Sequence, residues 1–177
     1  MKVTRILGAL AAAALLFAGS AASASAHTSD GIQKLRDVTD KYHSLTVAIH
    51  HQYGLLTDIN GISCIVDDMG TGAMGVHYAN GGLVGDGKIV ATKPEALLYY
   101  PGRDGKLHLS GVEYVVLKAD WDKHHQNPPR LYGQPFNFTP AGNRFGLPDF
   151  YSLHVWAWKF NPAGKFAMFN PTVHCPS

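Results

Sequence analysis

The chain has 177 residues, of which 16% are charged, with 15 lysines and arginines against 13 aspartates and glutamates. This length is enough for one domain with a real core, and the near-balanced charge gives no reason to expect nucleic acid or an anionic membrane as a partner. A hydrophobic content of 46% is that of a globular protein and argues against a disordered chain.

The first 26 residues are typical of a bacterial secretory signal peptide. Lys2 and Arg5 provide a positive start, residues 6–19 are almost wholly apolar, and Ala24–Ala26 fits the small-residue cleavage pattern. The apolar run is shorter than the roughly 20 residues that a transmembrane helix needs. The sequence therefore predicts a signal peptide at 1–26 and a single secreted, extracellular domain at 27–177, away from the membrane after cleavage. An uncleaved anchor is the alternative.

The chain contains two cysteines, Cys64 and Cys175. In the oxidising compartment that export implies, an even pair is most simply a disulfide. Free thiols or metal ligands are the alternative, but no CxxC spacing supports them. The loop that this bridge would close is long, so the chain-entropy model gives it about 4–5 kcal/mol of stabilisation.

The segment Ser29–Tyr53 is predicted to be one helix. Ser29 or Asp30 can cap its start and Gly54 can end it. Its apolar residues recur at spacings of three and four, so one face of the helix should lie on a core. These residues are Ile32, Leu35, Val38, Tyr42, Leu45, Ile49 and Tyr53.

After Gly54 the apolar runs become short and glycine and proline become frequent, which indicates strands and turns. The proline-rich, aromatic stretch Asp120–Asp149 is too irregular for a strand pair, and a loop of that length is usually functional or packs as a lid. The fold class expected is α+β, with one N-terminal helix packed on a mainly antiparallel sheet that can curl toward a barrel. The predicted strands are Ile62–Val66, Met74–Ala79, Ala96–Tyr100, Lys106–Leu117, Tyr151–Phe160 and Phe166–Phe169.

Three polar residues, His77, Glu113 and His154, stand inside these strand-like apolar runs. Each should be at least half buried, and burying a carboxylate costs several kcal/mol unless it is paired or bound to a metal. Strand alternation places Glu113 on the same face as Leu109 and Val115, which should be a core face. Glu113 therefore needs a partner.

Two histidines and one carboxylate suit zinc, copper, iron or another divalent metal, with positions left open for water or substrate. His77 and His154 would be neutral nitrogen ligands and Glu113 an anionic ligand or a general base, with Glu95 as a reserve carboxylate. A buried Glu–His hydrogen-bond pair that fixes the fold, or a proton-transfer site without metal, are the alternatives. Neither a Gly-x-Ser-x-Gly nor a phosphate-binding glycine motif is present, so the sequence supports neither nucleophilic catalysis by a serine nor a nucleotide phosphate site.

Two functional hypotheses follow. In the first, the secreted domain binds a divalent metal or a small ligand at the buried site made of His77, Glu113 and His154. In the second, the domain is a non-catalytic extracellular binding module. Its His/Glu cluster would then only order the core, and its aromatic loop would contact an extracellular partner.

Five short motifs carry a resemblance to known sequences: Met74–Tyr78, Pro94–Tyr99, Gly111–Tyr114, Leu153–Trp156 and Asn161–Phe166. Together they resemble a group of exported bacterial proteins of unknown function. The resemblance would cover most of the chain after the signal, and it implies export and a shared fold but no particular activity.

Overall fold

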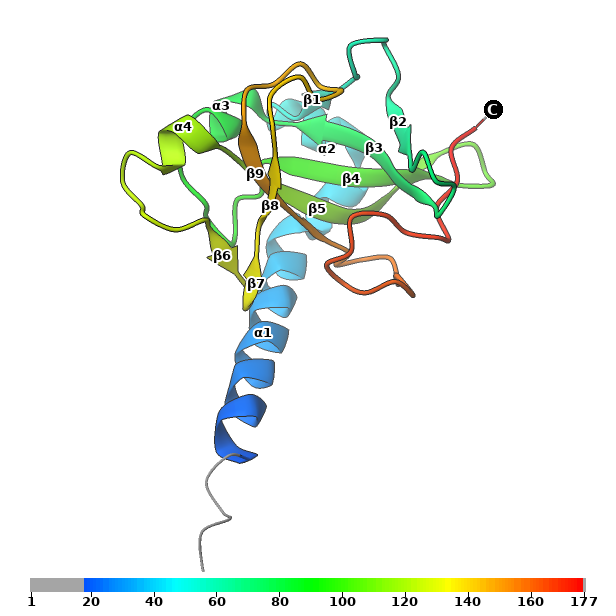
Figure 1. Cartoon of the computed structure of the whole chain (residues 1–177). Coiled ribbons are helices and arrows are strands. Elements are labelled where there is room, and N and C mark those ends of the chain that lie inside the picture. The colour runs from blue at the N-terminus through cyan, green and yellow to red at the C-terminus, as the bar shows by residue number, and fades with distance from the viewer. Residues whose placement is uncertain (1–17, 177) are drawn as a thin grey trace, which may run out of the picture.

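The fold is α+β and is built around an antiparallel sheet, as seen in a computed structural model that describes residues 18–176 (Figure 1). Within that range the main sheet has seven strands, and a separate two-stranded ribbon pairs β6 (Arg130–Leu131) with β7 (Gln134–Pro135). The spatial order of the main sheet is β1 (Gly54–Leu55), β3 (Ala73–Ala79), β4 (Ala96–Pro101), β5 (Leu107–Leu117), β9 (Phe150–Val155) and β8 (Asn137–Thr139). β2 (Cys64–Val66) pairs with the same edge of β3 as β1.

The sheet is open, so the expectation that it could curl into a barrel is wrong. β1 and β2 lie along one edge and β8 forms the other, and no pairing joins the two edges within the described residues. These edge strands are only two or three residues long. They are too short to provide the continuous ladder of hydrogen bonds that closure requires.

The segment predicted as one helix consists of three helical pieces: α1 (Ala18–Thr39), a 3-10 helix (Asp40–His43) and α2 (Leu45–His50). The helical conformation breaks at Ser44, whose backbone is extended. The predicted cleavage point after Ala26 lies within α1, and residues 1–17 of the predicted signal lie outside the described residues. No helix in the described part of the chain is both long and apolar enough to cross a membrane.

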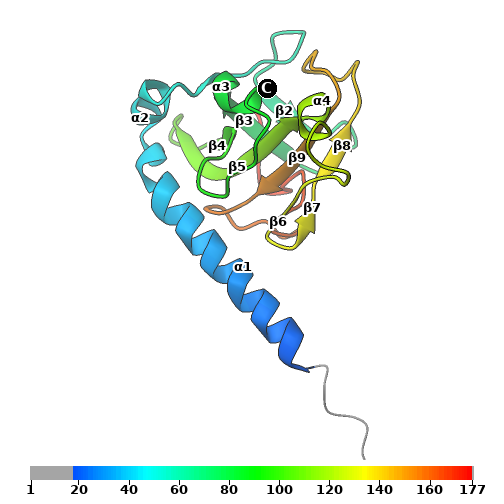
Figure 2. The same ribbon diagram turned by 90° about the vertical axis from the view of Figure 1, so that its left-hand side faces the viewer.

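The break at Ser44 lets both helices reach one core on one face of the sheet. Leu35 of α1 and Ala48 of α2 are fully buried in the same cluster as Leu97 and Tyr99 of β4. We call this the helix face. α2 and β8 lie at opposite sides of the molecule (Figure 2). Two further helices of one turn each, α3 (Gly81–Val84) and α4 (Lys118–Trp121), follow β3 and β5.

β5 contains a bulge that changes which side chains share a face. Leu98 pairs with Gly111 and Tyr99 pairs with Leu109, so Ser110 is one residue more than β4 can pair. Leu109 belongs to the helix-face core, whereas Glu113 points to the opposite face. The prediction that Glu113 and Leu109 share a face is therefore wrong, because strict alternation fails at a bulge.

The chain after β9 is irregular and is tied back to the sheet. The predicted disulfide is confirmed, since Cys64 and Cys175 are bonded with their Cα atoms 5.7 Å apart. The strand predicted at Phe166–Phe169 does not form, and a single bridge joins Asn170 to Ala73 instead. Side-chain hydrogen bonds hold the turns: Asn161 Nδ2 donates to the Phe169 carbonyl (3.0 Å) and Asn170 Nδ2 donates to the Phe160 carbonyl (3.1 Å).

Candidate metal centre

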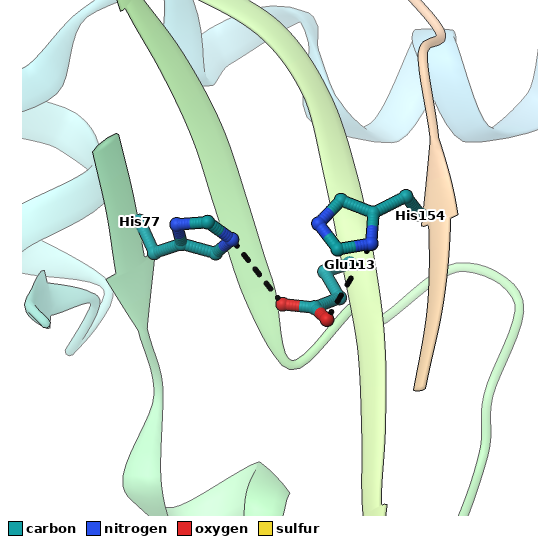
Figure 3. A group of neighbouring side chains, drawn as sticks. All are labelled: His77, Glu113 and His154. Atoms are coloured by element: carbon teal, nitrogen blue, oxygen red, sulfur yellow. Dashed lines mark ion pairs between the residues drawn. The ribbon is translucent and has the colours of Figure 1, made fainter. Parts of the chain in front are cut away.

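His77, Glu113 and His154 meet on the face of the sheet opposite the helices, which we call the site face. They come from β3, β5 and β9, and both imidazole rings are directed at the Glu113 carboxylate (Figure 3). Glu113 and His154 are direct cross-strand partners. His77 lies two strands away, beyond β4, where Glu113 pairs with Ala96. The small side chain of Ala96 leaves room for the carboxylate to reach toward His77.

The distances between the three side chains are those of metal ligands rather than of hydrogen bonds. His77 Nε2 lies 3.4 Å from Glu113 Oε2, and His154 Nδ1 lies 3.6 Å from Glu113 Oε1. One ring nitrogen from each histidine and one Glu113 carboxylate oxygen all lie within 4.8 Å of one another. Hydrogen bonds between nitrogen and oxygen span about 2.7–3.2 Å. Two ligands bound tetrahedrally to one zinc ion are about 3.4 Å apart.

The ring nitrogens of both histidines are buried without a partner. His77 and His154 are each only 1% exposed, and none of their four ring nitrogens has a hydrogen-bond partner within the described residues. A buried polar atom left without a hydrogen bond costs about 1–3 kcal/mol. A cluster that only ordered the core would be expected to hydrogen-bond these atoms, whereas a metal ion needs one ring nitrogen of each histidine free of such a bond.

Burial sets the protonation of the cluster. Desolvation lowers the pKa of His77 to about 4, against the opposing effect of Glu113, and it also lowers the pKa of His154 to about 4. Both imidazoles are therefore neutral at pH 7, as metal binding requires. Burial raises the pKa of Glu113, while His77 opposes that shift. A cation at the centre would remove the cost of holding this carboxylate ionised.

A hollow of about 260 Å³ opens beside the cluster and gives it an accessible side. Part of its wall is the loop between β8 and β9, including Asn143, Arg144 and Phe145. Arg144 Nη2 donates to the buried Asp58 carboxylate at 3.0 Å, and the Ile59 amide donates to the Arg144 carbonyl at 2.9 Å. These bonds hold the loop over the site. The lining also includes Met74, Thr139, Phe150, Ser152 and Met168.

Arg144 was missed by sequence reasoning. It lies in the long proline-rich stretch, which was predicted to be functional or lid-like as a whole, and no spacing in the sequence marks it. Its Nε atom is buried and has no hydrogen-bond partner within the described residues. The signal that could have found it is the nearby carboxylate, because Asp58 is buried and needs a cation.

Glu95, the reserve carboxylate, does not belong to this cluster. It immediately precedes β4, is 2% exposed, and accepts a hydrogen bond from the Val115 amide at 3.0 Å through Oε2. Burial raises its pKa to about 8, so it is mostly protonated at pH 7. It is not among the three residues that approach one another closely enough to share an ion.

Comparison of the chain with models of protein families, with curated proteins and with solved structures finds no match. The resemblance to exported bacterial proteins therefore stays a prediction. The case for a function depends on the geometry of the site face.

Proposed function

We propose that this protein binds one divalent transition-metal ion, with zinc as the first candidate and copper or iron as the others. His77 Nε2, His154 Nδ1 and the Glu113 carboxylate are the ligands. The observation that carries the proposal is the approach of two buried ring nitrogens, His77 Nε2 and His154 Nδ1, to the buried Glu113 carboxylate at ligand-to-ligand distances, without hydrogen-bond geometry. Two imidazoles and one carboxylate are a common protein ligand set for zinc and for non-haem iron.

The position of the ligands suits an ion that must stay accessible. Three strands fix their backbones, and the hollow beside the cluster leaves room for water or a small molecule at the remaining coordination positions. Bound zinc would polarise such a molecule and lower the pKa of a bound water to about 7. Arg144 and Asn143 line the same hollow and can orient what enters it.

We also propose that the protein acts outside the cytoplasm of a bacterium. The predicted signal peptide at residues 1–26 supports this location, and so does the Cys64–Cys175 disulfide, because such bonds persist in oxidising compartments.

The test is the metal content of the protein purified without a histidine tag or chelator. We expect about one equivalent of metal in the wild type and none in a folded His77→Ala/His154→Ala variant. A matched control, His124→Ala/His174→Ala, removes two exposed histidines and should keep the metal. Circular dichroism checks that all three proteins are folded. If the wild type stays metal-free after reconstitution with zinc, copper and iron, the cluster is structural and the protein is better described as a binding module.

A further inference from the structure

A second hollow borders the site and is almost entirely apolar. Its volume is about 160 Å³, and it shares Glu113, Phe145 and Phe150 with the hollow beside the histidines. The rest of its wall comes mainly from aliphatic side chains, among them Val84, Ala96, Val115 and Leu147. The site face therefore offers a polar compartment at the ligands and an apolar compartment next to it.

The size of the apolar compartment limits what it can hold. A cavity of about 150 Å³ lined by aliphatic and aromatic side chains takes one benzene molecule. The apolar hollow would thus accept one aromatic ring or a chain of about six carbons. Glu113 borders both hollows, so a molecule in the apolar one could place a polar head beside the metal ligands.

The charges around the polar compartment select the head group. With a divalent ion bound, the ion contributes two positive charges and Arg144 contributes one. Glu113 and the Asp58 carboxylate paired with Arg144 each contribute one negative charge. One positive charge is left over, and a monoanion would neutralise it. Arg144 also keeps its buried Nε without an acceptor within the described residues. A carboxylate oxygen is a strong acceptor for such a donor.

We propose that the site binds a small monocarboxylic acid, with its carboxylate between the metal and Arg144 and its apolar body in the second hollow. This inference rests on the proposed metal function. Glu113, His77 and His154 hold the ion, Arg144 binds the head group, and the walls formed by Phe145, Phe150 and the aliphatic side chains select the body.

Calorimetric titration of the zinc-loaded protein with acetate, butyrate, hexanoate, phenylacetate and 1-hexanol tests this inference. Each methylene that enters an apolar site is expected to strengthen binding about fourfold. Affinity should therefore rise from acetate to hexanoate, and phenylacetate should bind comparably to hexanoate. Hexanol, which lacks the charge, should bind much more weakly than hexanoate.

Two variants test the contacts of the acid's carboxylate and of its apolar body separately. Val84→Phe fills the apolar hollow and should weaken hexanoate binding at least about tenfold while acetate binding is unchanged. Val90→Phe adds the same ring at an exposed position and serves as the control. Arg144→Gln should weaken all the acids by about tenfold and leave hexanol unchanged.

Zinc is quantified in every sample, so the two proposals can fail separately. Zinc-loaded wild type that binds no acid, or that binds acetate as tightly as hexanoate, overturns the ligand assignment and leaves the metal site standing. Equal binding of hexanol and hexanoate overturns the role of Arg144. A wild type that holds no zinc overturns both proposals.

Discussion

The two faces of the sheet treat buried polar groups in opposite ways. On the helix face the tyrosine hydroxyls have partners: Tyr53 donates to the Pro94 carbonyl at 2.8 Å, Tyr99 to that of Tyr42 at 2.7 Å and Tyr114 to that of Ala91 at 2.6 Å. On the site face the ring nitrogens of His77 and His154 have none within the described residues.

This difference separates stability from function in the molecule. The helix face is complete by itself, because its apolar side chains are packed and its polar groups are bonded. The site face contains ring nitrogens without hydrogen-bond partners in the described residues, and natural proteins tolerate such groups where they have a use. Changes on the helix face should therefore lower stability, and changes on the site face should alter binding.

The largest effect is expected from the disulfide, which connects β2 at the sheet edge to the C-terminal segment of the chain. Cys64 and Cys175 are 111 residues apart, so opening their bond should lower the free energy of unfolding by about 4–5 kcal/mol. Urea unfolding of the Cys64→Ser/Cys175→Ser variant beside the wild type measures this loss. A loss below 1 kcal/mol would mean that both faces hold together without the bridge.

Next in size is the loss of one large side chain from the helix face. Leu97 is fully buried in that core, so Leu97→Ala should reduce stability by about 2–5 kcal/mol through lost contacts and a new cavity. Zinc affinity of the folded variant should stay at the wild-type value, which a competition titration with a chelator can measure. A large loss of affinity would show that the two faces are not independent.

The corresponding change on the site face should have the opposite sign. His154→Leu removes two unpartnered buried nitrogens and keeps a side chain of similar volume, so the metal-free protein should gain about 1–3 kcal/mol. The increase in melting temperature that zinc gives the wild type should disappear in this variant. Thermal unfolding with zinc and with EDTA gives both results. A metal-free variant that is much less stable than the wild type would favour a structural role for the cluster.

The last effect concerns Glu95 and is a dependence of stability on pH rather than a fixed loss or gain. Burial raises its folded pKa from 4.5 to about 8, so between these values the folded state keeps a proton that the unfolded state has lost. Its contribution to stability is complete below pH 4.5 and is lost as the pH rises to about 8. Relative to the wild type, Glu95→Gln should therefore gain stability steadily as the pH rises across this window, which urea unfolding at a series of pH values measures. A stability difference that does not change with pH would show that Glu95 is ionised throughout.

Much of the sheet could be predicted because its strands have clear sequence patterns. Met74–Ala79 and Ala96–Tyr100 match β3 and β4 to within one residue at each end. The polar residues of the cluster could also be found, since a histidine or glutamate inside an apolar run signals a buried group that needs a partner. That the three meet in space could not be read from spacings of tens of residues.

The features that the sequence did not reveal depend on tertiary contacts. The helix break at Ser44 follows from the need to bring Leu35 and Ala48 onto one core, and the apolar spacing continues through the break. The loop Asp120–Asp149 contains β8, which pairs with β9, and the β6–β7 ribbon, so the expectation that it is too irregular for a strand pair is wrong. Arg144 acquires a role only because this loop folds over Asp58.

The unpaired residue in β5, Ser110, also decides which single-codon deletions the strand can tolerate. Loss of the Ser110 codon alone would remove the bulge and leave Glu113 facing the histidines, because the two flanking parts already alternate in step with β4. Loss of one codon between Glu113 and Leu117 would turn the residues that follow it to the opposite faces. Within a single strand, a deletion at the bulge keeps the register of the site, whereas a deletion in the second half changes it.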